Sequence, residues 1–165
     1  MLLITENENN LLGEYAGFFS RAVAYVLDIV IISLTLLALN VLTWTVLGTI
    51  LHVTQETCQA AQFGPVRTLT CDITIWSLRA INSLFLPFYF IFLWIFGGQT
   101  IGNRIMGIRV VRLNGQRNTL FRSIGRLIGY VICFLTLGLG FFAILVNDRR
   151  QGWHDRIAGT VVIYA

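Results

Sequence analysis

The chain has 165 residues, of which 56% are hydrophobic and only 12% are charged, and its mean hydropathy is +0.73. A soluble domain carries about 25% charged residues, so the composition excludes an ordinary soluble protein and predicts a membrane protein. The length fits one compact domain. The net charge of +4 comes from 12 basic residues, all of them arginine, against 8 acids. Because most arginines flank apolar segments, we expect them to meet lipid headgroups and predict no nucleic-acid partner.

Two apolar segments lie in the first part of the chain, after a polar, mildly acidic tail at residues 1–15. The first segment, residues 16–51, is long enough to cross a hydrocarbon core of about 30 Å with residues to spare. Residues 52–78 are polar and predict a loop. Residues 80–96 predict a second transmembrane helix.

A third apolar segment, residues 121–146, is interrupted by the stretch "TLGLG" at 136–140. The segment is too short for two full crossings, which need about 40 residues. A single plain crossing would carry the arginine-rich tail to the opposite side of the membrane, against the positive-inside rule. We therefore predict a broken or re-entrant helical hairpin, with a plain third crossing as the alternative.

A small β-ribbon is predicted next to the membrane segments. Residues 107–120, "GIRVVRLNGQRNTL", alternate β-branched and polar residues around Asn114-Gly115, which is a strong hairpin signal. Residues 159–165 contain a second β-branched run. Because two strands alone are marginal, we expect the tail to add a third, which requires both segments on one side of the membrane. The predicted fold class is an all-α integral membrane protein with two transmembrane helices, a broken or re-entrant third segment and a small cytoplasmic β-ribbon.

The distribution of arginines predicts the orientation of the chain. The linker at residues 97–120 is rich in arginine, whereas the loop at 52–78 contains only Arg67. The positive-inside rule then places the linker and the N-terminus in the cytoplasm, and the loop outside. Cys58 and Cys71 lie in this extracytoplasmic loop, in the compartment where disulfides form. We predict a bridge between them, with two free thiols as the alternative.

Charged residues at membrane depth form the candidate functional site. Arg21 and Asp28 are two helical turns apart, which places them on one face of the first segment, about 10 Å apart along the axis. An ionised aspartate at this depth costs about 3 kcal/mol unless it is paired. We expect Arg126 from the third segment and Asp155 from the tail to complete an Arg/Asp cluster at the inner membrane surface. His154, beside Asp155, is a candidate proton relay.

Motifs that would indicate enzymatic chemistry are absent from the sequence, which has no Walker loop, no G-x-S-x-G and no H-E-x-x-H. His52 and His154 lie on opposite sides of the membrane in the predicted topology, so they do not form a zinc site. We therefore predict that the protein is not an enzyme and has no catalytic residues, no metal and no cofactor.

A family resemblance rests on three blocks, which begin at Phe18, Gly97 and Asn147: "FFSRAVAYVLDIVI", "GGQTIGNRIMGIRVV" and "NDRRQGWHDRIAGTVVI". In this order and spacing they resemble the RDD family of small bacterial and archaeal membrane proteins. Arg21 takes the place of the family's arginine, and Asp28 and Asp155 take the places of its two aspartates. The resemblance implies a single multi-pass domain, residues 1–165, in the cytoplasmic (inner) membrane of a prokaryote. Some family members have been linked to cation/proton exchange and many have no assigned role, so the resemblance implies architecture better than activity.

Two functions compete for the predicted cluster. In the first, the protein transports cations or protons, and Asp28 alternates between its protonated and ionised forms. In the second, the paired charges fix helix register, and the protein is an accessory or scaffold subunit of a larger membrane complex. An acid among arginines stays ionised, and three segments without an internal repeat are few for a transporter, so transport would need a homo-oligomer. Binding of a lipid or small anion is a third alternative. The expected partners are the bilayer and either further copies or a larger complex.

Overall fold

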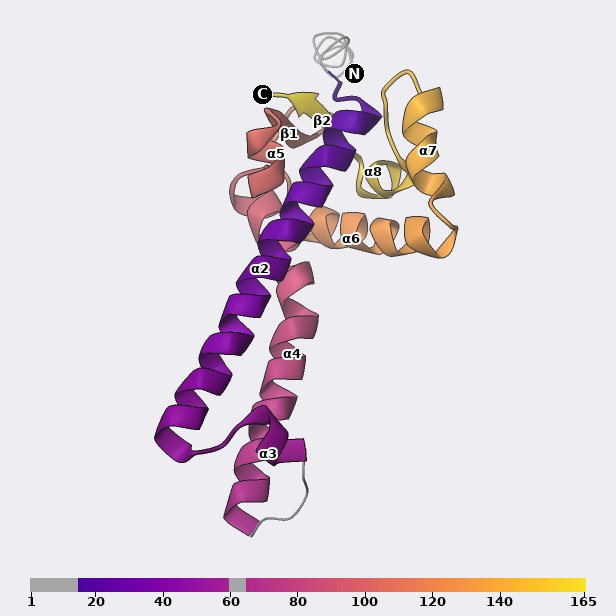
Figure 1. The fold of residues 1–165 in the computed structure, drawn as a ribbon. Helices are drawn as coiled ribbons and strands as arrows, with labels where there is room; N and C mark the ends of the chain where they lie inside the picture. The colour runs from indigo at the N-terminus through magenta and orange to yellow at the C-terminus, as the bar shows by residue number, and fades with distance from the viewer. Residues whose placement is uncertain (1–14, 60–64) are drawn as a thin grey trace. The chain divides into compact units, whose positions relative to one another are not determined.

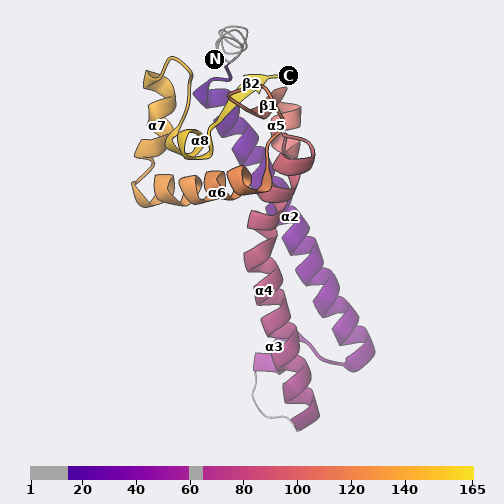
Figure 2. The same ribbon diagram turned by 180° about the vertical axis from the view of Figure 1, so that it is seen from behind.

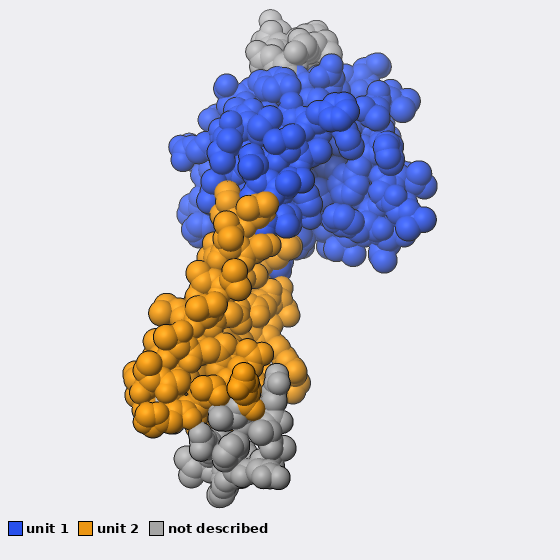
Figure 3. Space-filling view, viewed as in Figure 1, with its two compact units in different colours: residues 1–29, 87–165 blue, residues 30–86 orange. Residues whose placement is uncertain are grey.

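The computed structural model describes residues 15–59 and 65–165 (Figure 1). The described elements, in chain order, are α2 (Phe18–Leu51), α3 (Gln55–Gln59), α4 (Pro65–Phe96), α5 (Ile101–Ile105), β1 (Ile108–Arg112), α6 (Leu120–Leu135), α7 (Leu139–Val146), α8 (Trp153–Ala158) and β2 (Thr160–Tyr164). They fall into two compact units (Figure 3). Unit 2 comprises Val30–Leu86, and unit 1 comprises the described residues up to Ile29 together with Pro87–Ala165.

Two helices are long and apolar enough to cross a membrane: Phe18–Ile50 of α2 and Leu69–Phe96 of α4. With 34 residues, α2 is about 50 Å long, which exceeds a hydrocarbon core of about 30 Å. Its large apolar side chains are exposed, for example Leu34 at 61% and Leu42 at 61%. These findings confirm the two predicted transmembrane helices.

Among the described residues of unit 2, a disulfide and a pair of asparagines connect the helices. Cys58 of α3 and Cys71 of α4 form a disulfide with their Cα atoms 5.4 Å apart, which confirms the predicted bridge. Asn40 of α2 donates a hydrogen bond from Nδ2 to Oδ1 of Asn82 on α4, at 3.1 Å. Hydrogen bonds between asparagines join helices in an apolar environment, where burial of apolar surface does not drive association.

The prediction of a loop over residues 52–78 is wrong at α3 (Gln55–Gln59) and from Pro65 onward, where α4 begins. Proline is favoured at the first helical position, where its missing N–H would have no partner. The following turns carry threonine and isoleucine, whose helix propensity is modest, so the sequence did not favour a helix here. Leu69 and Ile73 are exposed apolar side chains of these turns, and they extend the apolar surface of α4 towards its start.

The third apolar segment is broken, as predicted. Helices α6 and α7 are bent by 105° at a short break after Leu135. Leu137 and Gly138 have φ angles of 53° and 86°, in the left-handed region that ends a helix, and glycine adopts it without steric cost. Within unit 1, α6 runs crosswise to the first turns of α2 (Figures 1 and 2).

A two-stranded antiparallel ribbon joins the linker to the tail, as predicted, with Val110 opposite Val162. The prediction that the residues after Asn114-Gly115 form the second strand of a hairpin is wrong. The chain turns at this point, since Gly115 N donates to Arg112 O at 2.9 Å, but residues 116–119 form no strand. The β-branched residues of β2 are buried against β1, whereas the second arm offered Arg117 and other polar residues. A third partner comes instead from the N-terminal side, where Tyr15 pairs with Ile163.

Candidate functional site

Asp155 is the centre of a buried ionic cluster in unit 1. Its carboxylate is fully buried, at 0% exposure. Arg21 of α2 approaches Oδ2 with Nη1 at 2.6 Å, and Arg126 of α6 approaches Oδ1 with Nη2 at 3.0 Å. The N–H of Gly152 also donates to Oδ2, at 3.3 Å, which places Asp155 in the first turn of α8 as a capping acid. Three elements therefore meet at one carboxylate.

Both arginines of this cluster are fixed by further contacts. Arg21 donates from Nε to Ala16 O at 3.1 Å and from Nη2 to Val162 O at 3.4 Å, which ties α2 to the middle of β2. The guanidinium of Arg126 lies 4.9 Å from the ring centre of Trp94 and 5.9 Å from that of Tyr130. Aromatic faces attract a cation electrostatically, so they stabilise a guanidinium that is only 3% exposed.

The electrostatics of α8 keep Asp155 charged and His154 neutral. Burial opposes ionisation of Asp155, but Arg126, His154 and Arg21 together hold the pKa of its carboxyl well below the usual range. Burial lowers the pKa of His154 from 6.5 to about 4, although Asp155 acts in the opposite direction. The imidazole stacks on Tyr130 with ring centres 4.2 Å apart. The relay role of His154 stays a prediction, and this side chain would charge only in acid.

Asp28 forms a second centre with different chemistry. Its carboxylate accepts hydrogen bonds from Tyr89 Oη at 2.7 Å, from Thr100 Oγ1 at 2.5 Å and from the N–H of Gly102 at 2.7 Å. The side chain is 1% exposed. Among the described residues, its partners are therefore neutral donors, whereas the sequence suggested an arginine. Because an ionised carboxylate only accepts hydrogen bonds, three donors satisfy it without a counter-ion.

The segment after α4 is built to reach Asp28. Thr100 caps α5, since its hydroxyl accepts a hydrogen bond from Asn103 N at 3.1 Å while donating to Asp28. Gly102 lets the two backbones approach, because a Cβ atom there would lie 2.1 Å from Ala24 O. The stretch "TIGN" is thus explained: threonine supplies the cap and the bond to Asp28, and glycine supplies the close approach.

A cavity of about 20 Å³ lies between the two centres, and Arg21, Asp28, Arg126 and Tyr130 are among the residues that line it. This volume is sufficient for one water molecule. Two buried nitrogens of Arg126, Nε and Nη1, make no hydrogen bond to any of the described residues. The cavity therefore combines polar walls with unused donors.

The structure brings Arg21, Arg126 and Asp155 together as predicted, with His154 beside them, and it separates Asp28 into its own hydrogen-bond network. Sequence reasoning missed Tyr89, Thr100 and Gly102 as partners of Asp28. Thr100 carried a readable signal, because a threonine before a short apolar stretch is a typical helix cap. Within residues 15–59 and 65–165, no group of three His, Cys, Asp or Glu side chains could hold a metal ion.

Fold and site together define a small helical membrane protein with two or three spans, organised around a buried arginine–aspartate cluster. The model of the RDD family matches residues 15–159, and the chain belongs to this family.

Similar proteins occur in bacteria. The uncharacterized protein YckC of Bacillus subtilis is 32% identical over 156 residues, which cover 91% of this chain and 85% of YckC. The uncharacterized protein RP437 of Rickettsia prowazekii is 38% identical over 85 residues, which cover 51% of this chain and only 47% of RP437. The match with RP437 thus spans about half the length of that relative. No solved structure matches the chain significantly.

Proposed function

We propose that this protein is a non-catalytic membrane scaffold, an accessory subunit that packs against a larger membrane complex. The observation that carries the proposal is the geometry of Asp155, a fully buried carboxylate between two arginines. Arginines on both sides keep such a carboxylate ionised, so it does not exchange protons during a transport cycle. The two ion pairs of Asp155 instead fix the positions of α2, α6 and α8 relative to one another.

The exposed surface of α6 and α7 supports the same function. Phe121, Leu137 and Val146 are 85%, 93% and 88% exposed, and they lie outside the two full crossings. Exposed apolar patches of this kind mark contact sites for another protein or for a membrane. The bent pair therefore offers a contact surface for the partner complex.

For the topology, we propose that both termini and residues 97–120 face the cytoplasm and that α6 with α7 re-enters the membrane. The pairing of β1 with β2 supports this, because these strands flank the bent pair in sequence and must lie on the same side of the membrane. The arginines of the linker favour the cytoplasmic side. Cys58 lies between the two spans along the chain, and its disulfide with Cys71 suits an oxidising, extracytoplasmic compartment.

Cation/proton exchange is the second candidate, and the cavity beside Asp28 favours it. Asp28 is buried without an arginine in direct contact among the described residues, so a change in its protonation would not break an ion pair. One water in the cavity could link it to the unused donors of Arg126. In this role Asp28 is the exchange site, and Asp155 stays charged.

Reconstitution into liposomes separates the two candidates. The full chain is inserted with a pH dye inside the vesicles, and a sodium or potassium gradient is then imposed. The scaffold function predicts no proton movement above that of protein-free vesicles. Gradient-driven flux that is lost in Asp28→Asn but kept in the exposed control Asp148→Asn would establish exchange and overturn the proposal.

The scaffold function also has a positive test. Extraction of native membranes in mild detergent should release a particle larger than the monomer, with a second protein at constant ratio through two purification steps. Polar substitution of the bent pair, Phe121→Gln with Leu137→Gln, should reduce that ratio. A monomeric particle under the mildest extraction would count against a scaffold.

A further inference from the structure

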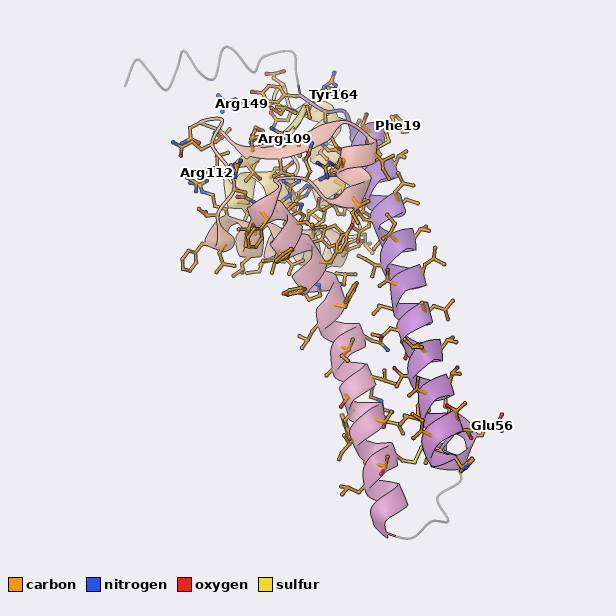
Figure 4. All side chains as sticks on the ribbon, turned by 90° about the vertical axis from the view of Figure 1, so that its left-hand side faces the viewer. Phe19, Glu56, Arg109, Arg112, Arg149 and Tyr164 are labelled. Carbon is orange, nitrogen blue, oxygen red and sulfur yellow. A yellow bond between two sulfur atoms is a disulfide. The ribbon has the colours of Figure 1, made fainter. Side chains whose placement is uncertain are left out.

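A second basic site lies in unit 1, away from the buried cluster. A groove of about 460 Å³ runs between the end of α4, α5, β1 and the turn that follows β1. Three arginines line it: Arg104, Arg109 and Arg117. We call this groove, with its three arginines, the arginine groove. Arg109 extends from β1, where Figure 4 labels it.

The three guanidinium groups differ from those of the buried cluster in having no partner among the described residues. Arg21 and Arg126 pair with Asp155, and Arg122 donates to the carbonyls of Ala158 and Gly159, each at 3.0 Å. By contrast, the side chains of the arginine groove make no ion pair or hydrogen bond to any residue within 15–59 and 65–165. None of the described residues that line the groove is acidic. Three like charges that line one groove without a counter-charge are suited to an anion of more than one charge or several acceptor oxygens.

The remaining wall of the groove is apolar. Leu93 and Phe96 belong to the last turn of α4, and Phe96 is 66% exposed. The apolar span of α4 ends at Phe96, so the groove begins at the level where hydrocarbon gives way to headgroups. An occupant must therefore present an anionic group to the arginines and a hydrocarbon chain to Leu93 and Phe96.

We propose that the arginine groove is a binding site for an anionic phospholipid, whose phosphate contacts Arg104, Arg109 and Arg117 and whose acyl chain follows Leu93 and Phe96. Guanidinium groups bind phosphate oxygens through forked, charge-assisted hydrogen bonds. A zwitterionic lipid carries a second, positive charge that the three arginines repel. The site is independent of the scaffold and exchange functions, because no residue of the buried cluster lines it.

Native mass spectrometry of the full chain in a non-ionic detergent tests the site. The protein is titrated with phosphatidylglycerol or with phosphatidylcholine of the same acyl chains, and bound lipid is counted. We expect phosphatidylglycerol to bind at least tenfold more tightly. Each of R104Q, R109Q and R117Q should weaken it about fivefold, since a basic residue near an anionic lipid surface contributes about 1 kcal/mol. The triple variant should not distinguish the two lipids.

Two controls make the result decisive. R156Q removes an exposed arginine of α8 outside the groove and should leave the affinity unchanged. Glycerol phosphate, which has the headgroup without acyl chains, should not displace the lipid at equal concentration. Equal binding of the two lipids, full binding by the single variants, or an equal loss in R156Q would overturn the site. Displacement by glycerol phosphate would identify a free-phosphate site and overturn the lipid assignment. The single variants remain informative if the triple variant fails to fold.

Discussion

Units 1 and 2 differ in the interactions that connect their helices and strands in and beside a membrane. Unit 2 joins its helices with a disulfide and with an asparagine pair of neutral side chains. Unit 1 buries Asp28 and Asp155, and it uses their hydrogen bonds and ion pairs to bring together segments far apart in sequence. Lipid chains are as apolar as leucine, so apolar burial cannot select partners between helices, whereas a buried charge must find its own partner. The comparison indicates that buried polar groups determine which segments of unit 1 pack together.

The largest effect should follow from breaking the ionic cluster on one side. Arg126→Ala leaves Asp155 buried with one of its two arginines, and we expect a loss of about 3–5 kcal/mol in the free energy of unfolding. The measurement is reversible unfolding of the purified protein in detergent micelles. The exposed Arg156→Ala is the matched control and should change the free energy by less than about 0.5 kcal/mol.

The double variant Arg126→Leu with Asp155→Leu sharpens this test. Removal of both charges leaves only Arg21 without its partner, so part of the loss should be recovered. A single variant as stable as the wild type would show that the cluster is not what holds unit 1 together.

A smaller effect should come from pH, and it should be confined to unit 1. His154 is buried against Tyr130 and lies among Arg21, Arg126 and Asp155. Its pKa is lowered on folding from 6.5 to about 4, so the unfolded chain binds the extra proton first and stability falls as the pH falls through this window. The stabilisation is present above pH 6.5. Between pH 7 and pH 5 we expect a loss of about 2 kcal/mol.

Unfolding at a series of pH values checks this expectation. His154→Asn removes the titrating group and should flatten the profile above pH 5. Below about pH 4, Asp155 adds a second loss, because its pKa is also lowered and its contribution disappears on protonation. A wild-type profile that is flat from pH 7 to pH 5 would contradict the neutral, buried state of the imidazole.

The next effect tests the close backbone contact between α6 and α8 in unit 1. A second glycine of α6 provides the control. A Cβ atom on Gly129 would lie 2.5 Å from the Cα atom of His154, whereas one on Gly125 would meet nothing within 4 Å. Gly129→Ala must push α8 away from α6, and we expect a loss of about 2 kcal/mol. Gly125→Ala should be neutral or stabilise by up to about 1 kcal/mol, because alanine is the better helix former. Equal effects of the two variants would contradict this packing of α6 on α8.

Much of this architecture could be predicted from the sequence because hydropathy, arginine distribution and β-branched runs are local signals. The two spans, the broken third segment, the ribbon between linker and tail, and the disulfide all follow from such signals. Arg21, Arg126 and Asp155 could be grouped because few charges occur at membrane depth, and each needs a partner. Two segments could pair with β1: the residues after the Asn-Gly turn and β2 from the tail. Local sequence signals do not show which of them pairs, and in the structure it is β2.

Asp28 illustrates the same limit within the site. Nearby arginines were the obvious partners from the sequence, yet the carboxylate accepts hydrogen bonds from Tyr89, Thr100 and Gly102 N–H. A backbone N–H is present in every residue except proline, so the sequence does not show which one binds a carboxylate. Hydroxyl side chains are common in helices, so their presence alone does not identify a partner of Asp28. Only the close approach at Gly102 makes this arrangement available, and that approach depends on how α5 packs against α2.

The smallest expected effect tests the neutral pair of unit 2. Asn40→Leu removes the hydrogen bond to Asn82 and replaces it with a side chain that lipid tolerates well. Interhelical hydrogen bonds in membranes contribute about 0.6 kcal/mol on average, because the separated helices also find polar partners. Asn82→Leu should therefore cost the same amount, and the double variant should cost no more than either single one. Unfolding in micelles, with the disulfide intact in every variant, measures this coupling. A coupling energy above about 2 kcal/mol would place the asparagine pair among the main determinants of the fold, and it would remove the contrast between a polar unit 1 and an apolar, covalently tied unit 2.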